Sequence, residues 1–168
     1  MVALITLAVA VAAAISDLAT RRIPNLLTFG AALAGLLYHA YVGGLSGFGW
    51  ALAGWVVGTA VFFPFFALGG MGAGDVKLFA ALGAWMGPLG AAKIAIAAAI
   101  AGGLVAVVVM LRHRYLRTAF DNLRLLFQHW TVNGMTAKPD LTLASSRGPR
   151  LAYAVPILLG TVGVLWWN

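Results

Sequence analysis

Long apolar runs separated by short polar breaks fill most of the chain. The runs cover residues 1–16, 25–42, 48–68, 76–90, 91–111 and 151–167. A helix that crosses the hydrocarbon core of a bilayer needs roughly 20 residues, with about 17 to 25 as the usual range. In lipid, each segment must satisfy its own backbone hydrogen bonds, which favours helices. The pattern therefore predicts an all-α, polytopic membrane protein with a bundle of about six transmembrane helices.

The division between the fourth and fifth runs depends on very few residues. Only Gly87-Pro88 and Gly90 separate these runs, so one long hairpin and two short helices would give the same pattern. Glycine and alanine are abundant throughout the chain. Such small residues allow membrane helices to approach one another closely.

Composition supports the same class. The 168 residues are 62% hydrophobic and 9% charged, and the mean hydropathy is +0.97. A soluble domain would carry roughly 25% charged residues. We therefore expect a single membrane-embedded domain over residues 1–168. Cysteine is absent, which excludes disulfides, thiolate chemistry and cysteine-based zinc sites.

The net charge of +7 has an explanation that requires no nucleic acid. Six spans place the polar segments 17–25, 69–75 and 112–150 on one side of the membrane. The basic residues on that side are Arg21, Arg22, Lys77, Arg112, Arg114, Arg117, Arg124, Lys138, Arg147 and Arg150, and only Lys93 lies on the other. Basic residues collect in cytoplasmic loops, so this side is predicted to be cytoplasmic and both termini to face outward. The expected partner is the lipid bilayer.

The first run resembles a signal peptide in its small residues. It has no basic region before it, and Arg21-Arg22 follow it directly. Both features oppose export of this end, so we expect the first run to remain as a helix.

An amphipathic pattern interrupts the long basic segment. Apolar residues recur at steps of three and four, at Leu116, Phe120, Leu123, Phe127 and Trp130, and the positions between them include Arg117, Asp121, Arg124 and Gln128. This pattern predicts a helix that lies on the membrane surface, with arginines against anionic headgroups. Residues 131–150 are rich in Gly, Pro, Ser and Thr, which predicts a loop.

Two of the four acidic residues are candidates for catalysis. Asp17 closes the first run and Asp75 opens the fourth, so the predicted topology places both at the cytoplasmic ends of helices. Two neighbouring carboxylates do not both ionise readily and hold one proton between them. The ionised partner can then take a proton from water while the protonated partner polarises a peptide carbonyl. The pair therefore predicts an aspartyl peptidase.

Other residues near the two acids are expected to shape the site. Gly72 and Gly74 carry no side chains and would let a substrate strand approach Asp75. Pro24 suits the first turn of the second helix. Asn25 is a candidate polar partner, and Lys77 is either part of the site or a residue that reaches the interface. Structural roles also remain open: Asp17 could pair with Arg21 across one turn, and Asp75 could stabilise a helix N-terminus.

Together these residues resemble the type IV prepilin peptidases, membrane aspartyl proteases of the Gly-x-Gly-Asp class. The resemblance covers Asp17 with Arg22-Ile23-Pro24-Asn25, then Gly72-Ala73-Gly74-Asp75-Val76-Lys77-Leu78, and finally Arg150 to Leu158 at the start of the last helix. It implies that Asp17 and Asp75 are catalytic and that neither a metal nor another cofactor is required. The implied partners are prepilins and pseudopilins, whose short basic leader is removed at the cytoplasmic face of the bacterial inner membrane.

The resemblance is to the short branch of that family. The longer branch has a cysteine-containing cytoplasmic insert and methylates the new pilin N-terminus, and this chain has neither cysteine nor room for such an insert. It therefore resembles the enzymes that serve Flp/Tad-type pili, and the sequence leaves open whether this chain methylates its product. The sequence does not identify the substrate, the cleavage site or the oligomeric state.

Two other functions are compatible with parts of the pattern. A proton-coupled transporter could use Asp17 and Asp75 as relay sites, but it would place them near the midplane and show internal repeats, and the sequence contains no convincing repeat. A non-catalytic scaffold for pilus assembly would tolerate the loss of either acid. Gly44-Leu45-Ser46-Gly47 with His39 resembles a serine protease motif, although a glycine-rich turn explains it better because serine needs an aligned base.

Overall fold

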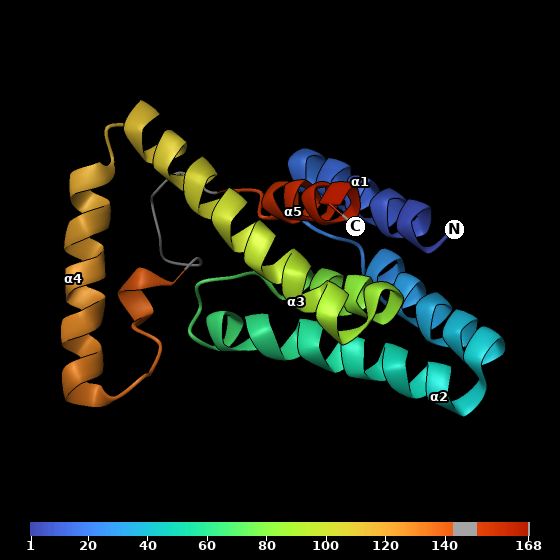
Figure 1. The fold of residues 1–168 in the computed structure, drawn as a ribbon. Helices are drawn as coiled ribbons and strands as arrows, with labels where there is room; N and C mark the ends of the chain where they lie inside the picture. Colours follow the sequence, from blue (N-terminus) through green and yellow to red (C-terminus); the bar gives the residue numbers. More distant parts are fainter. Residues whose placement is uncertain (143–150, 168) are drawn as a thin grey trace.

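In the computed structural model, which describes residues 1–142 and 151–167, the chain is helical (Figure 1). The elements are α1 (Val2–Thr20), α2 (Asn25–Ala67), α3 (Ala73–Arg112), α4 (Leu116–Asn133), the short 3₁₀ helix η1 (Pro139–Leu141) and α5 (Ala154–Trp167). No strand occurs in the described ranges. The predicted all-α class is confirmed.

The number of helices differs from the prediction of about six separate transmembrane helices. By length and composition, α1, α2 and α3 could each cross a membrane, and α5 is a shorter apolar helix. The second and third predicted runs both lie in α2, and the fourth and fifth both lie in α3. The predicted runs are therefore joined in pairs rather than divided by loops, because each junction is a kink at one non-helical glycine: Gly44 (φ 58°) in α2 and Gly87 (φ 68°) in α3.

These kinks reverse the direction of the chain. The ring centroids of His39 and Trp50 lie 4.8 Å apart, whereas eleven residues of straight helix would separate them by about 16 Å. In α3, a Cβ built on Gly83 would lie 3.3 Å from the Cβ of Ala91. Figure 1 shows α2 doubling back at the end farthest from α4. Each long helix is therefore a hairpin of two helical halves.

Glycines allow these halves to pack closely. The Cα of Gly54 lies against the backbone of Gly83, and Gly58 lies against the carbonyl of Phe79. A side chain at any of the three glycines would collide with backbone. The spacing of Gly54 and Gly58 is the small-xxx-small pattern of close membrane-helix contacts. The first half of α3 is thereby held against the second half of α2.

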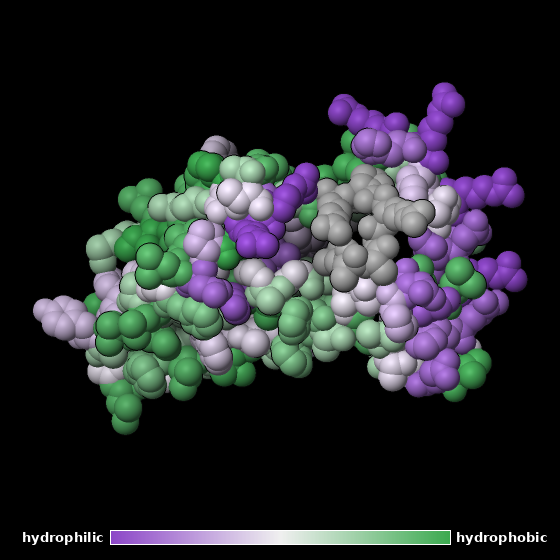
Figure 2. Space-filling model, turned by 180° about the vertical axis from the view of Figure 1, so that it is seen from behind, coloured by the Kyte–Doolittle hydropathy of each residue, from purple (hydrophilic) through white to green (hydrophobic). Residues whose placement is uncertain are grey.

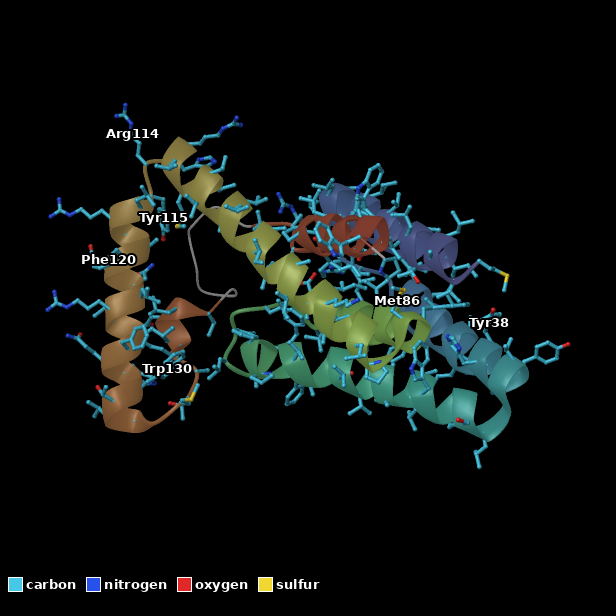
Figure 3. The ribbon with its side chains drawn as sticks, in the orientation of Figure 1. Tyr38, Met86, Arg114, Tyr115, Phe120 and Trp130 are labelled. Atoms are coloured by element: carbon cyan, nitrogen blue, oxygen red, sulfur yellow. The ribbon has the colours of Figure 1, made fainter. Side chains whose placement is uncertain are left out.

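Aromatic ring contacts hold the first half of α3 against the first half of α2, near the two kinks. The indole of Trp85 stacks on Tyr38 with centroids 5.5 Å apart and donates a hydrogen bond to the carbonyl of Ala31 at 2.8 Å. The Nε2 of His39 lies 3.1 Å from the Trp85 carbonyl. His39 thus has a structural role at the turn, in agreement with the turn interpretation of residues 44–47. Figure 3 shows Tyr38 and Met86 at this end of the molecule.

The core lies where α1, α3 and α5 meet. It contains Ala10 and Ala13 from α1, Ile94 and Ala98 from α3, and Ile157 from α5. Gly160 of α5 packs directly on the backbone of Ala98. This contact holds α5 on α3, and α1 packs in the same core. The start of α5 lies at the end of α1.

The predicted amphipathic segment forms α4, which has no buried residue. Figure 1 shows α4 standing apart from the helical body at the end of α3. Figure 2 shows hydrophilic residues gathered at this end, whereas most of the body on the same face is hydrophobic apart from one hydrophilic patch. Arg114, at the junction with α3, projects away from the body (Figure 3). The helix extends to Asn133 and η1 follows, so the predicted loop over 131–150 was wrong for these parts, and residues 143–150 lie outside the described ranges.

Candidate active site

Asp17 lies in the last turn of α1 and is 8% exposed. One carboxylate oxygen, Oδ2, accepts a hydrogen bond from the backbone N–H of Ala154 at 3.3 Å. Ala154 is the first residue of α5, where the backbone N–H groups have no partner within the helix and the dipole favours a negative charge. The start of α5 therefore holds the Asp17 carboxylate in place.

Asp75 lies in the first turn of α3, three residues after the N-cap Gly72. Its carboxylate is hydrogen-bonded by the Gly72 backbone, as an acidic residue at the third helical position does in a capping box. The carboxylate lies within electrostatic range of Asp17 and of Tyr153. Asp75 thus caps its helix and also lies near the second acid. Its stabilising role at the helix N-terminus is therefore compatible with a place in the candidate site.

The two aspartates line one cavity of about 480 Å³. The lining residues come from the end of α1, the α1–α2 connection, the start of α2 and the start of α3: Asp17, Arg21, Arg22, Ile23, Pro24, Asn25, Gly72, Ala73, Gly74, Asp75 and Lys77. All seven residues predicted for the site lie in this lining. The sequence separates them into two clusters, and the fold brings the clusters together.

The start of α2 is tied to the first turn of α3. The Nζ of Lys77 donates a hydrogen bond to the Oδ1 of Asn25 at 2.9 Å and lies 5.1 Å from the centroid of the Phe29 ring. Pro24 is the N-cap of α2, with φ −61° and ψ 134°. The sequence predicted Pro24 in the first turn of α2, whereas it lies just before that turn. Its carbonyl accepts hydrogen bonds from the backbone N–H groups of Leu27 and Thr28.

The glycines before Asp75 give room to two different neighbours. A Cβ on Gly72 would lie 3.1 Å from the Oδ2 of Asp75, and one on Gly74 would lie 3.3 Å from the Cβ of Ile23. Gly72 has φ −77°, so its backbone is open to other residues. Close approach, rather than an unusual backbone angle, explains glycine at both positions.

The connection between α1 and α2 forms one wall of the cavity and is fixed by local bonds. Arg21 ends α1 in the left-handed conformation, with φ 54°. The carbonyl of Arg22 accepts hydrogen bonds from the hydroxyls of Ser16 at 2.9 Å and Thr20 at 3.2 Å. Arg21 and Arg22 line the cavity beside the two acids.

Sequence reasoning missed the contribution of residues 153 and 154. Ala154 supplies only a backbone N–H, which no residue type reveals. Tyr153 lies within electrostatic range of Asp75, and its ring is 6.4 Å from that of Phe62. The available signal was the motif at the start of the last helix, which resembles a family pattern. That resemblance did not indicate that the N-terminus of the helix contacts Asp17.

The arrangement has the components of acid–base hydrolysis. Two carboxylates share a cavity large enough for water and a peptide, and backbone N–H groups fix both of them. Within the described residues, no group of three His, Asp or Glu side chains that could hold a metal ion occurs. The carboxylate pair is the candidate chemical group of this site.

The chain was also compared with known protein families. The model of the type IV leader peptidase family matches residues 4–107, which include both aspartates and the cavity lining. The comparison with curated proteins and the comparison with solved structures each found no match.

Proposed function

Because the chain belongs to the type IV leader peptidase family, we propose that it is an aspartyl endopeptidase of the Gly-x-Gly-Asp type, with Asp17 and Asp75 as its catalytic pair. The observation that carries this proposal is their convergence. One acid comes from the end of α1 and the other from the start of α3, and both line the same cavity.

The reaction follows from two carboxylates that hold one proton. The ionised carboxylate takes a proton from a water molecule, and the water oxygen attacks the carbonyl carbon of the scissile peptide bond. The protonated carboxyl donates its proton to the carbonyl oxygen, giving a tetrahedral intermediate. When the C–N bond breaks, the first acid gives its proton to the leaving amine, and the second carboxylate takes back a proton from a hydroxyl of the intermediate, which restores the pair. The products are a carboxyl group and a new amino terminus, and no oxidant or metal is consumed.

The membrane topology that we propose uses the hairpins as pairs of spans. Residues 25–43 and 45–67 of α2 would each cross the bilayer, as would 73–86 and 88–112 of α3, together with α1 and α5. The connections that carry Arg21, Arg22 and the cavity would then face the cytoplasm, as the distribution of basic residues requires. Both chain termini and both kinks would lie on the outer side of the inner membrane.

The proposed substrates are Flp/Tad-like prepilins and pseudopilins. Such a precursor carries a basic leader followed by an apolar helix, so its helix can enter the bilayer while the leader stays in the cytoplasm. The scissile bond then lies at the boundary where the two aspartates lie. The lack of cysteine favours the branch of the family without the cysteine-containing insert.

A reconstitution experiment tests this function. The purified protein in liposomes is incubated with a panel of Flp-type prepilins, and the products are identified by mass spectrometry. We expect one cut between leader and mature helix, and no product from the Asp75→Asn protein. Intact precursor with the folded wild-type protein, or full cleavage by Asp75→Asn, would contradict the proposal and favour a transporter or a scaffold.

A further inference from the structure

A second cavity, of about 220 Å³, lies beside the candidate active site. It lies between both halves of α2 and the first half of α3, and its lining includes Phe29, Ala32, Trp55, Thr59, Val76 and Ala80. Most of the lining is apolar. The hydroxyl of Thr59 donates a hydrogen bond to the carbonyl of Trp55 in its own helix at 2.9 Å, so it already has a partner within that helix.

Lys77 joins this cavity to the catalytic one, because its side chain lines both. Its Nζ is held by Asn25 at 2.9 Å and lies over the Phe29 ring. The charged end is thus directed toward the polar start of α2. The two cavities are therefore neighbouring compartments, one polar with two carboxylates and one apolar, with a single lysine between them.

The position and size of the apolar cavity suit one side chain of a bound polypeptide. Its α3 residues, Val76 and Ala80, follow Asp75 by one to five positions, a distance of up to about 7.5 Å along the helix. A cavity of about 150 Å³ is enough to hold benzene, so the observed volume accommodates a side chain as large as that of phenylalanine.

We propose that this cavity is the subsite for an apolar side chain in the first turn of the mature part of the precursor. This inference rests on the proposed function. The order of the basic leader and the apolar residues along the substrate supports this occupant. The basic leader remains on the polar side of the scissile bond, and the first apolar residues after the bond enter the membrane. A chain bound across the aspartates therefore presents an apolar side chain at the depth of Phe29 and Val76.

The test compares precursors that differ only at the first five mature positions, each changed in turn to Ala, Leu or Phe. Wild-type protein in liposomes should cleave one Leu or Phe series at least about tenfold faster than its Ala counterpart. Thr59→Leu fills the cavity and should abolish that preference by slowing the large-residue substrates. Trp55→Ala enlarges the cavity and should shift the preference toward Phe. Both variants are compared for folding by thermal unfolding in detergent.

A matched control fills a different apolar cavity. Ala97 lines the cavity between α3 and α5, and Ala97→Leu should keep the wild-type preference. If Thr59→Leu and Trp55→Ala leave the preference unchanged, or lower all cleavage rates equally, the subsite is wrong even though the peptidase is real. Rates that vary with lipid acyl-chain length and not with the substrate residue would also overturn it, by identifying lipid as the occupant. If wild-type protein cleaves no precursor, the proposed function itself fails.

Discussion

Backbone N–H groups hold each of the two aspartates in its place. The N–H of Ala154 binds Asp17 at 3.3 Å, and the backbone of Gly72 binds Asp75. Two carboxylates in one cavity repel each other when both are ionised. Fixed donors offset this repulsion and position the acids before substrate arrives, which is the geometric requirement for catalysis.

Gly72→Ala tests how closely Asp75 must be placed. The new methyl group would lie 3.1 Å from the Oδ2 of Asp75, so the carboxylate must move by a few tenths of an ångström. Small displacements at a catalytic group reduce rates strongly, and we expect cleavage to fall by about tenfold or more with little change in stability.

Gly30→Ala is the matched control for Gly72→Ala. No atom lies within 4 Å of a Cβ at Gly30, and alanine is favoured over glycine in a helix by roughly 1 kcal/mol. Its cleavage rate should equal that of the wild type. Wild-type activity in Gly72→Ala, measured on the same prepilin, would show that the Asp75 carboxylate tolerates displacement.

The sequence predicted the side chains that line the candidate site better than the backbone groups that hold them in place. Asp17, Asp75 and the glycines were identifiable because acids are rare in apolar segments and because the spacing resembles a family motif. The Ala154 N–H was not identifiable, since a backbone donor leaves no trace in residue type. Pro24 was placed one position too late, because proline suits both the N-cap and the first turn.

At the scale of elements, single glycines set the architecture. Gly44 and Gly87 have positive φ, a conformation that glycine adopts without cost, and each reverses a helix without a separate loop. The sequence predicted a break at both places. It overestimated the first, between runs 25–42 and 48–68, and placed the second a few residues after Gly87, because the apolar pattern does not show how the chain turns. The class of fold was predicted from the long apolar runs and the composition, and the amphipathic helix α4 from apolar residues at steps of three and four.

The position of α4 at the membrane is a prediction for a labelling experiment. Phe120 is 71% exposed and Phe127 is 58% exposed, which leaves an apolar face that a bilayer surface would cover. The chain has no cysteine, so Phe120→Cys can be labelled alone with a polarity-sensitive fluorophore in anionic liposomes.

We expect a blue-shifted emission that a lipid-borne quencher suppresses. Thr118→Cys, which lies about 160° around the same helix from Phe120 and is exposed, serves as the control and should report water. Equal emission from both positions would show that α4 does not lie at the interface.

At the scale of the whole molecule, the hairpins align the helical halves so that the polar connections gather at one end. Residues 21–25 and 72–75 line the cavity, whereas the kinks at Gly44 and Gly87 lie at the opposite end beside the Tyr38 and Trp85 rings. This separation is compatible with the proposed topology, in which the cavity faces the cytoplasm and the kinks face outward.

Single-cysteine labelling tests that topology. Ser46→Cys lies just after the first kink and Gly70→Cys lies in the α2–α3 connection. In spheroplasts, a membrane-impermeant maleimide should label Ser46→Cys at once and Gly70→Cys only after permeabilisation. Wild-type protein, without cysteine, gives the background. Labelling of both positions from the same side would rule out α2 as a pair of spans.

The shared action of the two acids is tested most directly by a double-mutant cycle. Cleavage of one prepilin in liposomes is measured for wild type, Asp17→Asn, Asp75→Asn and the double variant, all verified as folded and inserted. Residues that act as a unit are not additive, so each single variant should lose at least about 100-fold in rate and the double variant should be no slower than either. Wild-type cleavage by either single variant, or losses that multiply in the double variant, would contradict a catalytic pair.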